Sequence, residues 1–403
     1  MAVRASYGRL IALLAARSRD VAAAEDALAD ALGTALRVWH VRGIPRNPRA
    51  WLLTAARRSL GHASRHGRVQ ADAAVTLRLL AEEVQQRSSG DPAFPDERLK
   101  LLFICAHPAI DAAVRAPLML QTVLGLDAAR IGSAFLVPPA AMAQRLVRAK
   151  AKIRDAGIAF AVPGPDELDS RLDAVLDAIY AAYGTGWSDT ARTDPRRCEL
   201  AGEAIWLARL MVGLMPGEPE ARGLLALMLH CEARQPARRG PDGAFVPLAE
   251  QDTGLWSRPT IDEAEGHLTK ASLAGRIGRF QLEAALQSVH AHRIVSGRTD
   301  WEALATLYAG LVELTPAIGA KLGQAVAIAE VRGAQEALAL LEQIAPATVE
   351  GHQPYWVLRA HLHRQLGRRD EAAADYGRAV RLTEDAGVRS WLERRLRDVS
   401  GQD

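Results

Sequence analysis

Apolar residues recur at helical spacing along almost the whole chain, beginning close to the N-terminus. Leu10, Leu13 and Leu14 fall on one side of a first predicted helix. A second helix is expected after Asp20, a typical N-cap residue, and is expected to end before Gly43. Its apolar stripe consists of Val21, Ala24, Leu28, Leu32 and Leu36. A third helix is expected to start at Pro48. Proline has no backbone N–H, and in the first turn of a helix this group would have no partner within the helix, so proline is tolerated there.

A second group of helices follows a segment rich in loop-forming residues. Residues 88–95 have the sequence SSGDPAFP, whose Ser, Gly and Pro content predicts a linker. Four helical segments then fit into about 60 residues, a length typical of a small helical bundle. The sequence VPGPDE at 162–167 is expected to close this bundle.

The last two helices of that bundle have the pattern of a helix-turn-helix. Gly132 lets a second helix cross closely, and Pro138 and Pro139 set the start of that helix. Its inward face consists of Met142, Leu146, Ala149 and Ile153, and its outward face presents Gln144, Arg145, Arg148 and Lys152. Arg and Gln on such a face can donate to base edges and phosphates in a major groove. A helical hairpin with a solvated basic face is the alternative, and we favour DNA contact.

From Leu168 to the C-terminus the pattern predicts successive helices with short turns and no strand. Residues 354–383 have the spacing of a tetratricopeptide (TPR) unit, in which small residues let two antiparallel helices touch. The small and aromatic positions of this unit are Trp356, Ala360, Gly367, Ala372, Tyr376 and Ala379. Residues 301–316 and 323–346 are looser copies. The predicted fold class is therefore all-α, with a TPR-like C-terminal domain.

Composition supports helices and shows an uneven charge. Ala, Leu and Arg dominate, and these residues lose little side-chain entropy in a helix. The net charge is +3, but residues 1–160 hold 23 Lys and Arg against 13 Asp and Glu, so the remainder has a balance of −7. This asymmetry favours a polyanionic partner for the N-terminal part. No apolar run of about 18 residues and no signal-peptide pattern is present, so a cytoplasmic location without membrane contact is expected.

The sequence offers little for catalysis or for metal binding. Cys105, Cys198 and Cys231 are isolated, which argues against a disulfide framework and a CxxC zinc site. His107 and His230 lack any accompanying catalytic motif and are more typical of a core or boundary position. We therefore expect no enzyme activity, no catalytic residue, no cofactor and no metal.

Three other features allow two interpretations each. The third helix ends in a basic stretch, near two tryptophans, Trp39 and Trp51, which form either a second DNA surface or part of the core. Glu25, Asp26 and Asp30 on the second helix either dock a basic partner or are solvated. The segment 242–256 either orients helices or forms a contact loop, and the sequence does not decide between these.

Several stretches together resemble bacterial sigma factors of the extracytoplasmic-function group, in the subgroup with a C-terminal TPR-like extension. They include SYGRLIALLAARSRDVAAAEDALADALGTALRVW, GIPRNPRAWLLTAARR, DERLKLLFICAHPAI and FLVPPAAMAQRLVRAKAKIRDAGI, with LALMLHCEARQPAR and LAEQDTGLW further on. The resemblance covers nearly the whole chain. It implies a sigma region 2 domain at 1–69, a linker at 70–95, a region 4 helix-turn-helix domain at 96–160 and a TPR-like domain at 168–403.

The resemblance also implies partners and site residues. Region 2 would bind the clamp helices of the RNA polymerase β′ subunit, and region 4 would bind the β flap. No cofactor is expected to take part. Contacts with core polymerase would involve Glu25, Asp26, Asp30, Leu36 and Trp39. Contacts with the −10 promoter element would involve Arg46, Asn47, Trp51, Arg57, Arg58 and Arg65. Contacts with the −35 element would involve Pro139, Ala141, Gln144, Arg145, Arg148 and Lys152.

The chain departs from the family pattern in three places. Residues 60–64 have the sequence LGHAS where the family continues with a charged run, and Gly61 weakens this helix by up to about 1 kcal/mol relative to alanine. An acidic run is only partly kept at 249–252, and residues 183–186 replace an expected Asn-Glu-Gly run. These changes affect the −10 contact and the C-terminal contact surface.

The resemblance predicts a promoter-specificity factor whose C-terminal domain regulates it in cis, without a separate anti-sigma factor. A stand-alone helix-turn-helix regulator with a TPR-like sensor domain is the alternative, and co-purification of core polymerase distinguishes the two. A scaffold that uses TPR grooves and no DNA is a third hypothesis. It predicts that neutralising Arg145 and Arg148 leaves the function intact.

Overall fold

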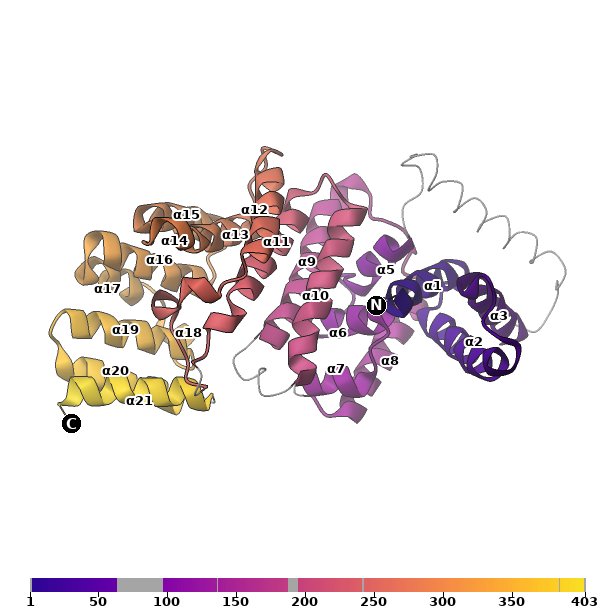
Figure 1. The fold of residues 1–403 in the computed structure, drawn as a ribbon, viewed down its shortest axis with the longest axis horizontal. Helices are drawn as coiled ribbons and strands as arrows, with labels where there is room; N and C mark the ends of the chain where they lie inside the picture. The colour runs from indigo at the N-terminus through magenta and orange to yellow at the C-terminus, as the bar shows by residue number, and fades with distance from the viewer. Residues whose placement is uncertain are drawn as a thin grey trace. The chain divides into compact units, whose positions relative to one another are not determined.

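The computed structural model describes residues 2–63, 97–135, 137–187, 195–240, 243–383 and 385–401. The fold is all-α, as predicted, and its helices are shown in Figure 1. Arg239 and Phe245 form an isolated β-bridge. The chain divides into two compact units, residues 1–214 and residues 215–403, which are called unit 1 and unit 2. The predicted linker at 70–95 and the candidate residue Arg65 lie outside the described residues.

Unit 1 begins with the three predicted helices, and the second and third of them start where the sequence predicted. They are α1 (Ala2–Ser18), α2 (Val21–Arg42) and α3 (Pro48–Ala63). The Asp20 carboxylate accepts a hydrogen bond from the Ala23 N–H, which confirms the predicted N-cap of α2. Gly43 ends this helix with a φ of 79°, a conformation that glycine adopts without strain.

The next four helices form the predicted bundle. They are α5 (Glu97–Cys105), α6 (Ala112–Leu124), α7 (Ala128–Ala134) and α8 (Pro139–Asp155). Gly132 on α7 lies so close to the next helix that a Cβ there would stand 2.7 Å from the Val137 carbonyl oxygen and 3.3 Å from the Met142 Cβ. The close crossing predicted at Gly132 is therefore present, and it sets the turn between α7 and α8.

Helices α9 (Pro165–Trp187) and α10 (Pro195–Leu214) complete unit 1. The sequence placed them at the start of the C-terminal domain, whereas in the structure α9 packs on α5 and α6, and α10 packs on α7. Arg171 on α9 donates a hydrogen bond to the Phe103 carbonyl oxygen on α5. The apolar faces of α9 and α10 are thus buried within unit 1, and the boundary between the compact units falls after Leu214.

Unit 2 consists of helices joined by short turns. The helices are α11 (Pro219–Ala233), α12 (Arg258–Ser272), α13 (Arg279–Ala291), α14 (Arg293–Ser296), α15 (Trp301–Leu314), α16 (Ile318–Arg332), α17 (Ala334–Glu342), α18 (Pro346–Val349), α19 (Gln353–Gln365), α20 (Arg369–Arg381) and α21 (Ala386–Ser400). Five of the six predicted TPR positions are buried in α19 and α20, where Ala360, Ala372 and Ala379 are fully inaccessible. Gly367 forms the turn with a φ of 74°.

The described part of the segment 242–256, here named the strap (residues 243–256), joins distant parts of unit 2. It contains two short 3₁₀ turns, η3 (Leu248–Glu250) and η4 (Thr253–Leu255), and Figure 1 shows it running between α11 and the last helices. Arg293 after α13 donates hydrogen bonds to the carbonyl oxygens of Leu248 and Gln251. Glu250 pairs with Arg395 of α21 at 3.0 Å. The segment that the sequence left undecided therefore orients helices.

A buried polar cluster lies where the strap meets α11 and α13. The ring of Trp256 is 4% exposed, and the guanidinium carbons of Arg234 and Arg293 lie 6.0 and 5.3 Å from its centre. Arg234 also donates a hydrogen bond of 2.5 Å to Gln287. Burial, together with the charge of Arg234, lowers the pKa of His230 to about 4, although the Glu265 carboxylate lies 3.4 Å from its Nε2.

Candidate nucleic-acid interface

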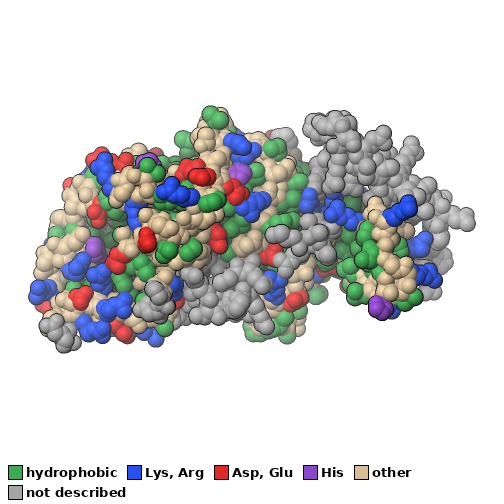
Figure 2. Space-filling view, viewed as in Figure 1, with side chains coloured by type: hydrophobic (Ala, Val, Ile, Leu, Met, Phe, Trp, Pro, Cys, Tyr) green, Lys and Arg blue, Asp and Glu red, His purple; other side chains and the backbone are tan. Residues whose placement is uncertain are grey.

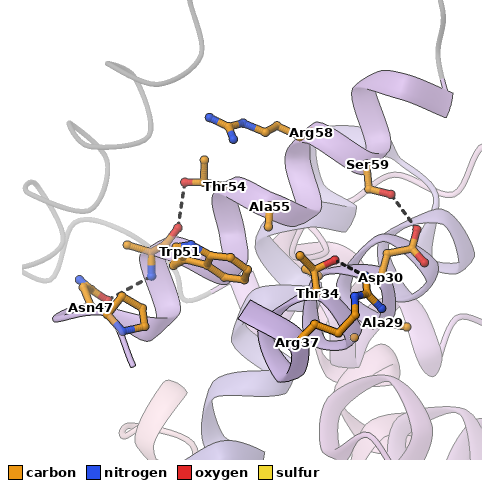
Figure 3. A pocket seen from close by; sticks show the side chains of 14 residues that line it. Ala29, Asp30, Thr34, Arg37, Asn47, Trp51, Thr54, Ala55, Arg58 and Ser59 are labelled. Atoms are coloured by element: carbon orange, nitrogen blue, oxygen red, sulfur yellow. Dashed lines mark hydrogen bonds between the residues drawn. The ribbon is translucent and has the colours of Figure 1, made fainter. Parts of the chain in front are cut away.

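A groove with a volume of about 960 Å³ lies between α2 and α3 in unit 1 (Figure 3). The Trp51 ring from α3 points into this α2–α3 groove, toward Thr34 and Arg37 of α2. Trp51 packs edge-on against Trp39 with ring centres 5.4 Å apart. The two tryptophans thus form one aromatic unit, with part of Trp51 accessible from the groove.

The walls of the α2–α3 groove combine cations with hydrogen-bonding groups. Arg37 and Arg58 are exposed and line it from opposite helices. Arg37 donates a hydrogen bond to the Thr34 hydroxyl at 3.2 Å, and Ser59 donates to the Asp30 carboxylate at 2.9 Å. An accessible aromatic face between two guanidinium groups suits a flat, negatively charged partner such as an unpaired nucleotide.

The structure brings some of the predicted −10 residues together and separates others. Asn47, Trp51 and Arg58 line the α2–α3 groove. Asn47 also caps α3, because its side-chain oxygen accepts a hydrogen bond from the Ala50 N–H at 3.1 Å. Arg46 is exposed on the preceding loop, and Arg57 is half-buried on another side of α3, so neither lines the groove.

Sequence reasoning missed Arg37 as a groove residue. Arg37 follows Asp30 by seven positions, which is two helical turns, so both fall on the same side of α2. Both line the groove in the structure. The periodicity that correctly predicted the burial of Val21, Ala24 and Leu28 could have identified this polar stripe as well, whereas Leu36, assigned to the same apolar stripe, is exposed.

Most of the predicted polymerase-binding residues are accessible on α2. Asp26 and Asp30 are exposed, and the side chain of Leu36 is 78% exposed. Val41 and Ile44, which the sequence did not single out, are 80% and 73% exposed just beyond it. Trp39 is half-buried against Trp51 and is less accessible.

Helix α8 divides into two faces as the sequence predicted. Met142, Leu146, Ala149 and Ile153 are buried, whereas Gln144, Arg145, Arg148 and Lys152 are exposed. Of the other two predicted −35 residues, Pro139 is exposed and Ala141 is half-buried in the first turn of α8. Arg148 donates a hydrogen bond to the Gln144 side-chain oxygen at 3.3 Å, which orients both groups along the exposed face.

Surface charge differs between the units. On the face shown in Figure 2, the described parts of α2 and α3 present mostly blue and green side chains, which are basic and apolar. Over unit 2, red and blue side chains are interspersed on that face. The concentration of positive charge predicted for the N-terminal part is therefore visible around the α2–α3 end of unit 1, where it would raise the local concentration of a polyanion.

Glu25 has a different environment from the other acidic residues of α2. Its carboxylate oxygen Oε2 lies 2.5 Å from Lys150 Nζ of α8, and the two side chains are 12% and 9% exposed. Burial raises the pKa of Glu25, and the charge and hydrogen bond of Lys150 oppose this increase without cancelling it. In this structure the Glu25 carboxylate is thus paired with Lys150 of α8, whereas its neighbour Asp26 is exposed to solvent.

The described residues give no sign of a metal site. No group of three or more His, Cys, Asp and Glu side chains in the described ranges has an arrangement suited to a metal ion. Within the same ranges, none of the helices combines the length and the apolar character that crossing a membrane requires.

Comparisons with other proteins identify relatives of the chain. Residues 171–272, from α9 to α12, match a family of unknown function (DUF6596). An uncharacterized protein of Rhizobium meliloti (strain 1021) is 37% identical over 391 residues, which cover 95% of this chain and 92% of the relative. No solved structure matches the chain.

Proposed function

The chain belongs to the family of this Rhizobium meliloti protein, and we propose that it is a sigma factor of the extracytoplasmic-function type. In this role it binds core RNA polymerase in the cytoplasm and directs it to promoters with −10 and −35 elements. It is not itself a catalyst, because the polymerase carries out the phosphoryl transfer. The observation that carries the proposal is the division of α8 into a buried apolar face and an exposed basic face behind the close crossing at Gly132.

Helix α8 is the proposed −35 reader. Gln144, Arg145 and Arg148 project from its exposed face, which also carries the exposed apolar side chain of Val147. Arg and Gln can each make two hydrogen bonds to a base edge, and a good bidentate pair contributes about 1–3 kcal/mol of discrimination. Lys152, one turn beyond Arg148, is placed to contact a phosphate and so to set the register of the helix.

The α2–α3 groove is the proposed contact with the −10 element. An unpaired base can stack on the accessible face of Trp51, and such stacking contributes about 1–3 kcal/mol per base. Arg37 and Arg58 on the two sides of the groove would neutralise the adjoining phosphates. The groove thus suits single-stranded rather than base-paired DNA, as strand opening at a −10 element requires.

The exposed side of α2 is the proposed contact with core polymerase. Asp26 would pair with a basic residue of the β′ clamp helices, and Leu36 would supply apolar area. Asp30, which was also predicted for this contact, instead lines the α2–α3 groove and accepts a hydrogen bond from Ser59. The helix-turn-helix would contact the β flap. Unit 2 would regulate these contacts in cis, so no separate anti-sigma factor is required. If removal of residues 215–403 leaves promoter output unchanged, the cis-regulatory part of the proposal is wrong.

Transcription with purified core RNA polymerase tests the proposal. The full chain should co-purify with core polymerase and should start transcripts at specific sites in a library of genomic promoters. Arg145→Ala combined with Arg148→Ala should abolish specific initiation but leave co-purification intact. Lys270→Ala, which removes an exposed charge from α12, is the matched control and should change neither result. Specific DNA binding without any association with core polymerase would instead identify a stand-alone regulator.

A further inference from the structure

A small cleft in unit 2 lies between two helices that pack on the same third helix. Helices α12 and α13 both pack on α11 (Figure 1), and the cleft between them has a volume of about 250 Å³. Side chains of α12, α13 and α14 line this α12–α13 cleft. Its volume is close to the lower end of the range for small-molecule sites, about 300–1,000 Å³, so it suits a small ligand.

The walls of the α12–α13 cleft are apolar. Ile261 of α12 and Ala291 of α13 are buried, with exposed fractions of 8% and 5%. Ile294 of α14 is half-buried, and Val295 beside it is 77% exposed. Covering such surface with hydrocarbon removes apolar area from water, which favours binding. An occupant of the cleft should therefore carry an alkyl segment.

Glu265 of α12 provides a half-buried negative charge within the cleft. Its oxygen Oε1 accepts a hydrogen bond of 2.6 Å from the Ser288 hydroxyl of α13. The same oxygen lies 3.4 Å from Nε2 of His230 on α11, and the Glu265 side chain is 41% exposed. The carboxylate is therefore held between α11, α12 and α13, and part of it remains accessible from the cleft.

His230 does not neutralise this carboxylate. The His230 side chain is 1% exposed, and neither ring nitrogen has a hydrogen bond within the described part of the chain. Burial and the charge of Arg234 lower the pKa of His230 to about 4, so the ring is uncharged at neutral pH. Among the described residues, Glu265 forms no ion pair with a lysine or an arginine. A half-buried carboxylate without a cationic partner would be stabilised by a bound cation.

The charges at the mouth of the cleft offset each other. Arg258 and Asp262 are four residues apart on the side of α12 that carries Glu265, and both are exposed. Opposite charges at this spacing largely cancel, and solvent screens them further. His292, which is also exposed there, can take part in a hydrogen bond. The unbalanced charge of the cleft is then that of Glu265, so the cleft favours a cation over an anion.

We propose that the α12–α13 cleft binds a protonated aliphatic amine. The ammonium group pairs with the Glu265 carboxylate, and the alkyl chain covers Ile261, Ile294 and Val295. An ammonium group has three donors, so a second one can bond to the Ser288 hydroxyl, whose oxygen is still able to accept. A metal ion would leave the apolar walls uncovered. The site lies within unit 2, and the proposal does not depend on the proposed function.

Ligand-observed NMR with the full chain at neutral pH tests the site. Titrations that follow saturation transfer from the protein compare n-butylamine, which is protonated at this pH, with n-butanol, which has the same chain and no charge. The amine should bind at least about tenfold more tightly, because a charge-assisted hydrogen bond contributes this much or more. Methylamine should bind at least about tenfold more weakly than n-butylamine, because it lacks three methylene groups that the apolar walls would cover.

Three variants separate the carboxylate and the mouth of the cleft from the rest of unit 2. Glu265→Gln keeps the size of the side chain, removes its charge and should weaken binding of n-butylamine by about tenfold or more. Val295→Lys, at a largely exposed position, adds a cation beside the cleft and should weaken binding by about threefold or more. Glu313→Gln, at an exposed position of α15 outside the cleft, is the matched control and should leave the affinity unchanged.

The proposal has several ways to fail. Absence of saturation transfer to n-butylamine, or equal affinities for n-butylamine and n-butanol, would overturn it. Unchanged affinity in a Glu265→Gln variant that unfolds at the wild-type temperature would do the same. If Glu265→Gln does not fold, unchanged affinity in Val295→Lys decides against the site.

Amide hydrogen exchange locates the bound amine. With n-butylamine, exchange in α12, α13 and α14 should slow, whereas slowing confined to unit 1 would show that the amine binds elsewhere and would overturn the site. None of these measurements involves RNA polymerase, so their failure leaves the proposed function unaffected.

Discussion

Arg239 and Asp385 are separated by 146 positions and form an ion pair of 2.6 Å that closes unit 2 on itself. Arg239 lies just before the strap, and Asp385 caps α21 by accepting a hydrogen bond from the Val388 N–H. Burial alone would raise the pKa of Asp385, but the hydrogen bonds from Arg239 and Val388 hold it below its usual value. The final helix is therefore anchored to the first part of unit 2.

Replacing Arg239 should loosen this anchor. Arg239→Ala leaves the half-buried Asp385 carboxylate with fewer donors, and the expected loss of stability is about 1–2 kcal/mol. Amide hydrogen exchange in α21 should accelerate accordingly. Arg332→Ala removes a pair whose side chains are both more than half exposed and should leave exchange in α21 unchanged. Equal amide hydrogen exchange rates in α21 of the wild type and of Arg239→Ala would show that the ion pair does not stabilise the packing of this helix.

The stability of unit 2 should fall as the pH falls from about 7 to about 4. Burial lowers the pKa of His230 and of His290 to about 4 in the folded protein, below the value of 6.5 for an exposed histidine. Between these values the unfolded chain binds protons that the folded chain excludes, so stability present above pH 6.5 is lost on acidification. The loss approaches about 3 kcal/mol per histidine below pH 4.

Amide exchange in α11 and α13 across this pH range, corrected for the intrinsic rate, measures the effect. His230→Gln should reduce the pH dependence, and His40→Gln, at an exposed position of α2, should not. Identical pH dependence in wild type and His230→Gln would mean that His230 does not titrate in the way the structure indicates.

The turn between α7 and α8 should not tolerate a side chain at Gly132. Gly132→Ala places a Cβ 2.7 Å from the Val137 carbonyl oxygen, and such overpacking costs about 1–3 kcal/mol. Gly202→Ala, on α10 of the same unit, meets nothing within 4 Å and should stabilise the chain by about 0.5–1 kcal/mol. Chemical denaturation of both variants measures the two effects, and the close crossing would be disproved if Gly132→Ala left the stability unchanged or raised it.

The proposed binding of DNA in the α2–α3 groove requires the aromatic ring of Trp51. Trp51→Ala should weaken binding of a single-stranded −10 oligonucleotide to the protein–polymerase complex by about tenfold or more, whereas Trp51→Phe should keep most of the affinity. Fluorescence anisotropy with a labelled oligonucleotide measures both. Equal losses in the two variants would indicate that Trp51 supports the fold of the groove and does not stack on a base.

Local patterns in the sequence were sufficient to predict the helices and the two faces of α8. The spacing of Met142, Leu146 and Ile153 determines which side of that helix is buried, and helical periodicity makes this visible without a structure. The same reasoning predicted the TPR positions Ala360 and Tyr376, which are buried in unit 2.

Contacts between distant parts of the chain could not be predicted in this way. Lys150 and Glu25 are single charges on separate helices, and neither carries a periodic signal that names the other. Arg239 and Asp385 are likewise single charges that do not indicate each other as partners. The packing of α9 on α5 and α6 also could not be predicted from local patterns. The apolar face of a helix shows that another helix must pack against it. It does not show which one, because many helices in the chain have an apolar face that could do so.

The strap has a consequence for how this protein can change in length. An open array of helical repeats can gain or lose a unit, because each unit contacts only its neighbours. Here an inserted helix pair, with helices packed about 8–10 Å apart, would carry Asp385 beyond the reach of Arg239 and Trp391 beyond that of Phe245. Insertion or deletion of a helix pair in unit 2 would thus break this closure, so relatives of this chain are expected to keep the number of helices between Arg239 and Asp385.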